Sequence, residues 1–136
     1  MTTWLLVADD ETWTNLLGAK VWMLSNRYKR MARRIKIGED AIAYVKYFSG
    51  IYGIVKITSE VFRQNGTPYP IRFNIEPEIF LDEPVSIRPL IQSLSFIKNK
   101  KRWFAYFQTS LRRIPEKDFA LVRGYLIRER QKISSR

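Results

Sequence analysis

The sequence predicts an α+β domain organised around a small β-barrel with helices at its flanks. The barrel is indicated by two apolar runs of strand length, residues 41–45 and 51–57, which are rich in β-branched and aromatic side chains. Ser49-Gly50 lies between them and can supply a tight reversal, while Gly53 predicts a bulge, a bend or a close backbone approach. Two adjacent strands buried on both faces, one of them bent, suit the centre of a small barrel.

The length of 136 residues predicts a single domain over residues 1–136, with the last few residues frayed. Contents of 46% apolar and 14% aromatic residues argue against disorder. No apolar run approaches the roughly 20 residues of a membrane span, and the N-terminus lacks the pattern of a signal peptide. We therefore expect a cytoplasmic protein without a membrane partner, and no feature of the sequence predicts an oligomeric state.

Cysteine and histidine are both absent from the chain. Their absence excludes disulfides, thiol nucleophiles, Cys/His zinc sites and any triad that depends on histidine. An enzyme would have to use carboxylates, Lys, Tyr or a cofactor, but Asp9-Asp10 and Glu39-Asp40 are more typical of a helix cap and a turn. We therefore predict that the protein is not an enzyme and has no cofactor or metal.

The formal net charge is +11, from 24 Lys and Arg against 13 Asp and Glu. So large an excess on a small domain favours a polyanionic partner, above all nucleic acid. The alternative is a soluble, cation-rich surface without a specific ligand.

The N-terminal part is expected to begin with a short buried strand at residues 4–8. A helix at about 11–17 follows, capped by Asp9 and Asp10 and ended by Gly18. Beyond a brief apolar stretch at 21–24, Ser25-Asn26 caps a basic helix over residues 27–35. The free N–H groups at the start of this helix and its cationic face suit a phosphate, although a solvated face is an equally good interpretation.

The C-terminal part alternates short strands and helices. A turn-rich loop at 63–70 leads into a half-buried strand at 69–75, which Pro77 interrupts before a short apolar segment at 79–81. A short helix is expected to begin near Pro89, and a longer helix is expected to begin at Pro115. Between them, residues 96–107 interleave cations and aromatics as stacking and phosphate contact require, although some of these aromatics are expected to pack in the core.

Several segments in a fixed order carry a resemblance to a known family. They are the opening strand at 4–7 with Trp13, Trp22 before the basic helix, the segment 37–44, the segment 50–54, and 96–103 followed by 114–119. In their order and spacing the chain resembles the EVE domains, which belong to the PUA-like superfamily and are relatives of the YTH domains, and in particular their small archaeal members. The resemblance covers nearly the whole length. It implies a small, partly open β-barrel flanked by helices.

The same resemblance implies a non-enzymatic reader of a modified base in RNA or DNA. In such domains the base lies in an aromatic-lined pocket, where stacking contributes roughly 1–3 kcal/mol per base and hydrogen bonds to the base edges select its identity. Carried over by position, Trp22 and Tyr69 are the expected pocket walls, and Trp103 is a further candidate. The expected polar edge readers are Asp9, Ser25 and Asn26, and the expected phosphate contacts are Arg27, Lys29, Arg30, Lys100, Lys101 and Arg102.

Two departures from the family pattern bear on the pocket. Met23 stands where many relatives have glycine, which predicts a more crowded pocket floor, and Val45 replaces a histidine. A second interpretation therefore stays open: a general RNA-binding module, closer to PUA domains acting on tRNA or rRNA, in which Trp22 is merely structural. Steep salt dependence without a preference for modification would favour it.

Overall fold

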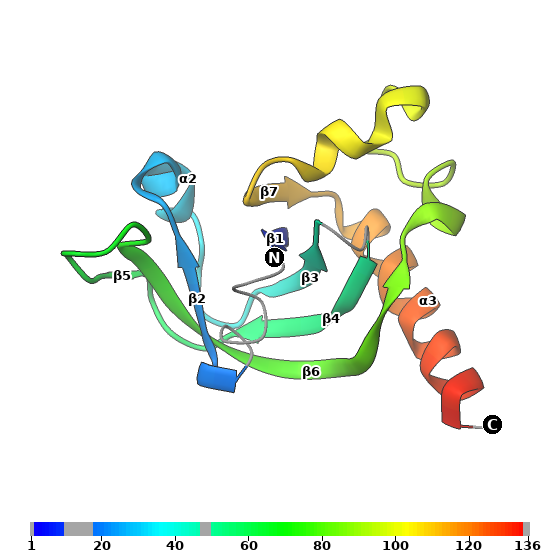
Figure 1. Cartoon of the computed structure of the whole chain (residues 1–136), viewed down its shortest axis with the longest axis horizontal. Helices are drawn as coiled ribbons and strands as arrows, with labels where there is room; N and C mark the ends of the chain where they lie inside the picture. Colours follow the sequence, from blue (N-terminus) through cyan, green and yellow to red (C-terminus); the bar gives the residue numbers. More distant parts are fainter. Residues whose placement is uncertain (1, 10–17, 47–49, 135–136) are drawn as a thin grey trace.

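The computed structural model describes residues 2–9, 18–46 and 50–134, and it shows one curled sheet with helical segments packed against it (Figure 1). Its strands are β1 (Thr3–Ala8), β2 (Val21–Leu24), β3 (Asp40–Val45), β4 (Gly50–Ile57), β5 (Phe62–Arg63), β6 (Ile71–Ser86) and β7 (Leu111–Ile114). Its helical segments are η1 (Asn26–Tyr28), α2 (Lys29–Ala32), η2 (Arg88–Leu90), η3 (Lys100–Phe107) and α3 (Glu116–Ser134). None of the described helices is long and apolar enough to cross a membrane.

The strand order is β2-β6-β4-β3-β1-β7, with β5 paired to β6. Among the described strands, β1 and β3 pair in parallel and the other pairings are antiparallel. β2 and β7 stand at the two ends of this order, so the sheet curls into a barrel that is not closed between them (Figure 1). This confirms the expected α+β fold with a small, partly open barrel flanked by helices.

The predicted central hairpin is formed by β3 and β4, which pair from Asp40 opposite Lys56 to Val45 opposite Gly50. Both strands are buried on both faces over most of their length. Gly53 lies at a register shift with respect to both neighbouring strands. A Cβ atom there would come within 2.0 Å of the Ile79 carbonyl oxygen, so the glycine permits a close approach of β6 and the sharp curvature that the barrel needs.

Two hydrophobic cores lie on opposite faces of the central strands. One core, inside the curled sheet, includes Trp4, Leu6, Trp22 and Phe73. The other joins the outer face to α3 and η3, and in it Phe107 stacks on Tyr44 with a centroid separation of 4.4 Å. Because successive residues of a strand point to opposite faces, near-continuous apolar runs in β1, β3 and β4 supply both cores at once.

Two buried carboxylates tie loops to this framework. Glu39 accepts hydrogen bonds from the Trp4 indole N–H at 3.1 Å, the Thr2 N–H at 2.9 Å and the Lys36 N–H at 2.6 Å. Asp118, in the first turn of α3, accepts three bonds of 2.9 Å, from the N–H and hydroxyl of Ser95 and the N–H of Phe96. Each carboxylate is satisfied by several donors, as burial of a charge requires. Both carboxylates therefore have a structural role, because each connects segments that are distant in the sequence.

Two expectations for the secondary structure need correction, and one strand was not expected. Pro77 does not interrupt the strand: β6 runs unbroken from Ile71 to Ser86, with Pro77 opposite Val55 at a register shift, where a missing N–H is tolerated. The basic helix is short, because a 3-10 turn precedes an α-helix of only four residues, Lys29–Ala32. Strand β7 is an addition that the sequence did not indicate. The helix expected at 11–17 lies outside the described residues.

Candidate functional site

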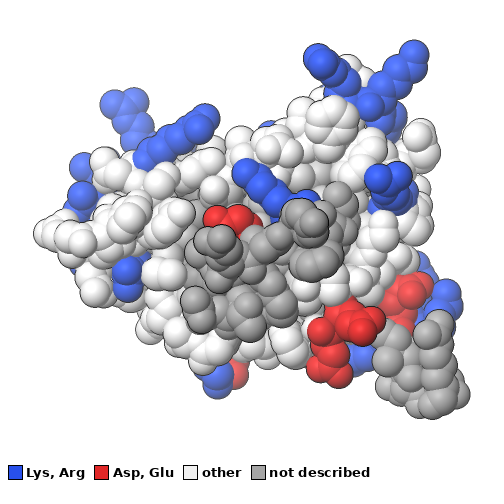
Figure 2. Space-filling view, in the orientation of Figure 1, with Lys and Arg blue, Asp and Glu red and all other residues white. Residues whose placement is uncertain are grey.

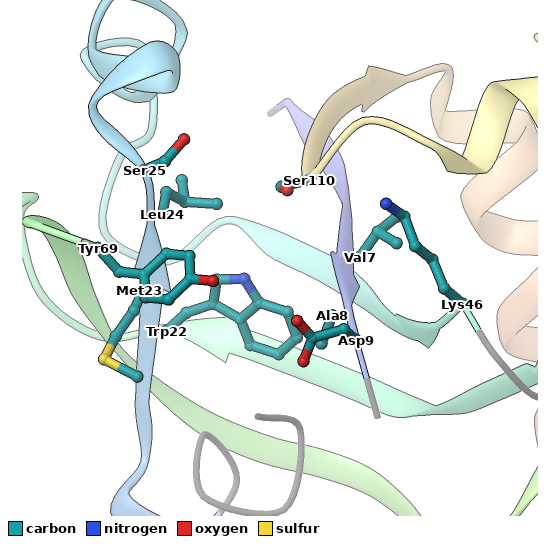
Figure 3. Close-up of a pocket in the computed structure, with 10 residues that line it drawn as sticks. All are labelled: Val7, Ala8, Asp9, Trp22, Met23, Leu24, Ser25, Lys46, Tyr69 and Ser110. Carbon is teal, nitrogen blue, oxygen red and sulfur yellow. The ribbon is translucent and has the colours of Figure 1, made fainter. Parts of the chain in front are cut away.

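A cavity of about 90 Å³ opens at the end of the barrel where β1 and β3 terminate (Figure 3). We call it the Trp22 cavity. It is bounded on one side by β2 and the start of β6, and on the other by the ends of β1 and β3 and by the residue before β7. Its lining residues are Val7, Ala8, Asp9, Trp22, Met23, Leu24, Ser25, Lys46, Tyr69 and Ser110.

The two expected aromatic walls are brought together in this cavity but differ in burial. Trp22 is 2% exposed and belongs to the core inside the sheet, opposite Phe73 of β6. Tyr69 is 38% exposed and lies just before β6. Trp22 therefore forms a fixed floor, whereas Tyr69 is an exposed side wall with room to adjust.

Met23 stands where the sequence predicts crowding of the cavity floor. It is among the lining residues, but its sulfur atom lies on the side away from the Trp22 indole (Figure 3). Met23 is half-buried and also packs against the core inside the sheet that contains Trp22. Met23 is therefore part of the cavity lining on the β2 side.

The polar edge of the cavity contains two of the three expected groups. Asp9 and Ser25 line it, and Figure 3 shows the Asp9 carboxylate beside the Trp22 ring. Asn26 does not, because its side-chain oxygen accepts a hydrogen bond of 2.9 Å from an Nη atom of Arg63. Asn26 instead connects η1 to strand β5, to which Arg63 belongs.

Trp103 lies outside the Trp22 cavity. Its ring packs edge-on against Phe107 at a centroid distance of 6.0 Å, next to the core beneath α3. The Arg88 guanidinium lies 5.7 Å from the centre of the same ring. By contrast, Phe104 is 51% exposed, so the segment 96–107 divides its aromatics between core and surface.

The expected phosphate contacts are exposed cations on two separate elements. Arg27, Lys29 and Arg30 are exposed on η1 and α2, and Lys101 and Arg102 are exposed on η3. Lys100 differs, because its ammonium donates to the carbonyl oxygens of Ile91 at 3.0 Å and Leu94 at 2.7 Å. Figure 2 shows Lys and Arg side chains along the upper edge of the molecule, over α2 and over η3.

Lys46 and Ser110 are cavity residues that the sequence did not identify. Lys46 directly follows β3, and its N–H donates to the Ala8 carbonyl at 3.0 Å because β1 and β3 run parallel. Ser110 precedes β7, and its N–H donates to the Tyr28 hydroxyl at 2.8 Å. This bond joins the η1 side of the cavity to the β7 side. A signal for Lys46 would have required knowing that β1 and β3 end at the same edge.

The groups around the cavity are able to stack on a ring, to form hydrogen bonds and to carry charge. An aromatic floor, an aromatic side wall, a carboxylate, two hydroxyls and an ammonium lie around one small space. Within the described ranges, no group of three or more His, Cys, Asp or Glu is arranged to hold a metal ion.

Comparison with known proteins connects this arrangement to one family. A family model described as the EVE domain matches residues 2–125. A UPF0310 protein of Pyrococcus abyssi is 34% identical over 144 residues, with 93% of this chain and all of the relative covered.

Two solved structures share the fold at low sequence identity. The YTH domain-containing protein mmi1, in a complex with RNA, gives a TM-score of 0.75 at 9% identity, covering 99% of this chain and 87% of the other. The YTH domain of Zygosaccharomyces rouxii MRB1 protein, in complex with N6-methyladenosine RNA, gives 0.70 at 14% identity, covering 92% and 86%. Since the family model spans nearly the whole sequence and the Pyrococcus relative exceeds 30% identity, the chain belongs to the EVE domain family.

Proposed function

We propose that this protein is a non-enzymatic nucleic-acid-binding module that holds one base, carrying a modification, in the Trp22 cavity. The observation that carries the proposal is the meeting of Trp22 and Tyr69, far apart in sequence, with the polar groups of Asp9 and Ser25 around one space. Stacking walls with hydrogen-bonding groups at their edge are the means by which proteins recognise an unpaired base.

The size of the cavity supports a single flat ring as its occupant. A volume of about 90 Å³ is well below the roughly 300–1,000 Å³ of cavities that enclose drug-sized ligands. A base would enter edge-first beside Trp22, with the exposed Tyr69 moving to cover it. In this arrangement a methyl group on the base gains apolar contact with the aromatic walls, worth about 0.8 kcal/mol if fully buried.

The charge of the molecule supports a polyanion as the carrier of that base. The net charge is +11, and the exposed cations of η1, α2 and η3 stand on either side of the cavity entrance. Two fold relatives in the family of YTH domains are bound to RNA, one of them to N6-methyladenosine RNA. These relatives support nucleic acid as the partner of this chain, in the form of RNA or DNA.

A second candidate function is general RNA binding without preference for a modified base. The observation that favours it is the burial of Trp22, because a ring only 2% exposed offers little surface for stacking unless its neighbours move. Recognition would then come from phosphate and shape contacts, and binding would depend steeply on salt.

The test is a titration of the protein with matched single-stranded oligonucleotides. Plain, 5-methylcytosine and N6-methyladenine versions, as DNA and as RNA, are compared at a lower and a higher salt concentration. A gain for one modification that persists at higher salt supports the base cavity. Equal binding to every version, with the same loss at higher salt, would reject it and establish the second candidate.

Substitution of Tyr69 and Trp22 connects that gain to the cavity. Tyr69→Ala is expected to reduce the preference while the protein stays folded, because Tyr69 is an exposed residue. Trp22→Ala would cost about 3–5 kcal/mol of core packing, so Trp22→Phe, which keeps an aromatic ring of smaller area, is the better variant. Phe104→Ala is the control, because Phe104 is also exposed but lies outside the cavity. An undiminished preference in Tyr69→Ala would remove Tyr69 from the site.

A further inference from the structure

A second concave surface lies between η3 and β7. It is a groove of about 300 Å³ lined by Asn99, Arg102, Ala105, Tyr106 and Arg112, and we call it the η3 groove. Two of its five residues are arginines, and none is acidic. Such a lining favours an anion, and planar guanidinium groups match the oxygen pairs of a phosphate better than an ammonium does.

Arg112 is held in position inside this groove. Its Nε donates to the Tyr106 carbonyl at 3.2 Å, and its guanidinium carbon lies 5.4 Å from the centre of the Tyr106 ring. Among the described residues, neither Nη atom of Arg112 has a hydrogen-bond acceptor or an ion-pair partner. Its orientation is therefore fixed by contacts that leave its two strongest phosphate-binding groups unused, so little entropy is lost when a ligand binds.

Tyr106, which contacts the Arg112 guanidinium, is itself held by hydrogen bonds. The Tyr106 hydroxyl accepts hydrogen bonds of 3.1 Å from the N–H groups of Lys98 and Asn99. The Asn99 side chain in turn accepts from the Arg102 N–H at 3.3 Å, where the backbone of η3 is kinked. This kink places the exposed Arg102 beside the same groove. Both arginines that would contact an anion, Arg112 and Arg102, are therefore positioned by hydrogen bonds.

The η3 groove lies next to the Trp22 cavity along the chain. Ser110 lines the cavity and Arg112 lines the groove, and these two residues are about 7 Å apart along an extended chain. A single strand whose base occupies the cavity would carry its next phosphates past Ser110 toward Arg112. We propose that the η3 groove binds the phosphodiester backbone of that strand, with Arg112 and Arg102 as its phosphate ligands. The inference rests on the proposed nucleic-acid function and adds the path of the strand.

The experiment measures how oligonucleotide affinity depends on salt in three variants. Arg112→Gln and Arg102→Gln each remove one groove cation. Arg113→Gln is the matched control, because Arg113 is the neighbouring exposed cation but faces the other side of β7 and does not line the groove. The ligand is a single strand of about nine nucleotides, titrated at four salt concentrations between about 0.05 and 0.4 M.

Each groove variant is expected to lower the slope of log K against log salt by about 0.7 and to weaken binding about fourfold at 0.15 M salt. The preference between modified and plain bases stays unchanged, because the cavity is intact. Arg113→Gln is expected to keep the wild-type slope. If both groove variants show the same salt slope and the same affinity as Arg113→Gln, the inference is wrong. Should Arg112→Gln unfold, as a thermal melt would reveal, Arg102→Gln decides the question, because its side chain is exposed.

Two further readouts separate this inference from the others. Titration with inorganic pyrophosphate tests for a small-anion site: if Arg112→Gln weakens pyrophosphate but not the oligonucleotide, the groove binds free anions and the strand path is wrong. If instead the base-reading proposal is wrong, the wild-type protein binds modified and plain oligonucleotides equally well. The groove variants still lower the slope of log K against log salt in that case. A wild-type protein that binds no oligonucleotide would reject both.

Discussion

Trp22 and Tyr69 line the same cavity but differ in how far packing constrains them. The sequence resemblance placed both at one site, and the structure brings them together. The sequence could not show whether Trp22 packs in the core or lines a cavity. An aromatic residue in a strand gives the same sequence pattern in both cases. Likewise, the interleaved cations and aromatics of residues 96–107 did not reveal that Trp103 packs beside Phe107 while Phe104 is exposed.

Gly53 is the residue whose role follows most directly from sequence. A substituted Cβ would meet the backbone oxygen of Ile79 at 2.0 Å, so β4 and β6 would have to separate. We predict that Gly53→Ala lowers the free energy of unfolding by at least about 3 kcal/mol, as measured by chemical denaturation. Gly124→Ala in α3 is the control, because its Cβ would meet only the flexible Arg128 side chain at 3.5 Å. That variant should gain about 0.5–1 kcal/mol. A Gly53→Ala protein as stable as wild type would contradict the close contact between the two strands.

At the scale of elements, the sequence indicated individual strands better than their neighbours. The β3–β4 hairpin was predictable because its two strands follow each other in the chain and Val45 pairs with Gly50. The parallel pairing of β1 with β3 was not, because it joins distant segments with no local signal. For this reason Lys46, which reaches the cavity only through that pairing, was missed. The continuity of β6 through Pro77 depends equally on its partner strand.

A hydrogen bond connects Tyr28 of η1 to Ser110, the residue before β7, across the cavity. Tyr28→Phe removes the acceptor of the Ser110 N–H, a bond of 2.8 Å. We predict a loss of about 1 kcal/mol in unfolding free energy together with weaker oligonucleotide binding, because Ser110 lines the Trp22 cavity. Tyr125→Phe is the matched control: it deletes a bond of 3.0 Å to the Ser86 carbonyl, away from the cavity. Equal binding losses in the two variants would show that Tyr28 acts through stability alone.

Three neighbouring strands are joined on their outer face by Lys56 of β4. Its ammonium lies 3.1 Å from Asp40 of β3 and 3.2 Å from Glu78 of β6. The hydrogen bond to Asp40, followed by that to Glu78, raises the pKa of Lys56 above its ordinary value of 10.5. A raised pKa means that the folded state keeps the proton to higher pH than the unfolded state does. The stability from this cluster is therefore fully present below pH 10.5 and is lost as pH rises through the folded-state pKa.

We predict that Lys56→Gln flattens part of the decline of unfolding free energy above pH 10.5. The effect should be well under 1 kcal/mol, about the value of an exposed ion pair, because the Lys56 side chain is 42% exposed. Denaturation curves collected across this pH range provide the measurement, with Lys132→Gln, from the exposed helical pair with Glu129, as the comparison. A decline of identical steepness in wild type and Lys56→Gln would contradict the prediction.

At the scale of the whole molecule, charge is distributed unevenly over the fold. The exposed cations of α2 and η3 occupy the upper edge, whereas four carboxylates lie between residues 76 and 83 of β6, on the far side of the sheet from these elements (Figures 1 and 2). We expect this distribution to favour approach of a polyanion from the side of α2 and η3. The net charge could be calculated from the sequence. The separation of the two kinds of charge could not be predicted in the same way, because it depends on where the fold places β6 relative to α2 and η3.

The same excess charge predicts opposite effects of salt on folding and on binding. With a net charge of +11, the folded protein repels itself, and screening by salt relieves that repulsion. Raising salt from about 0.05 to 0.5 M should therefore raise the melting temperature by a few degrees. Over the same range, release of counterions from three or four phosphate contacts should weaken single-strand binding about 10²- to 10³-fold. Thermal melts and titrations on one preparation measure both quantities. A melting temperature that falls over the same range would show that the ion pairs of the fold outweigh self-repulsion and would contradict the prediction.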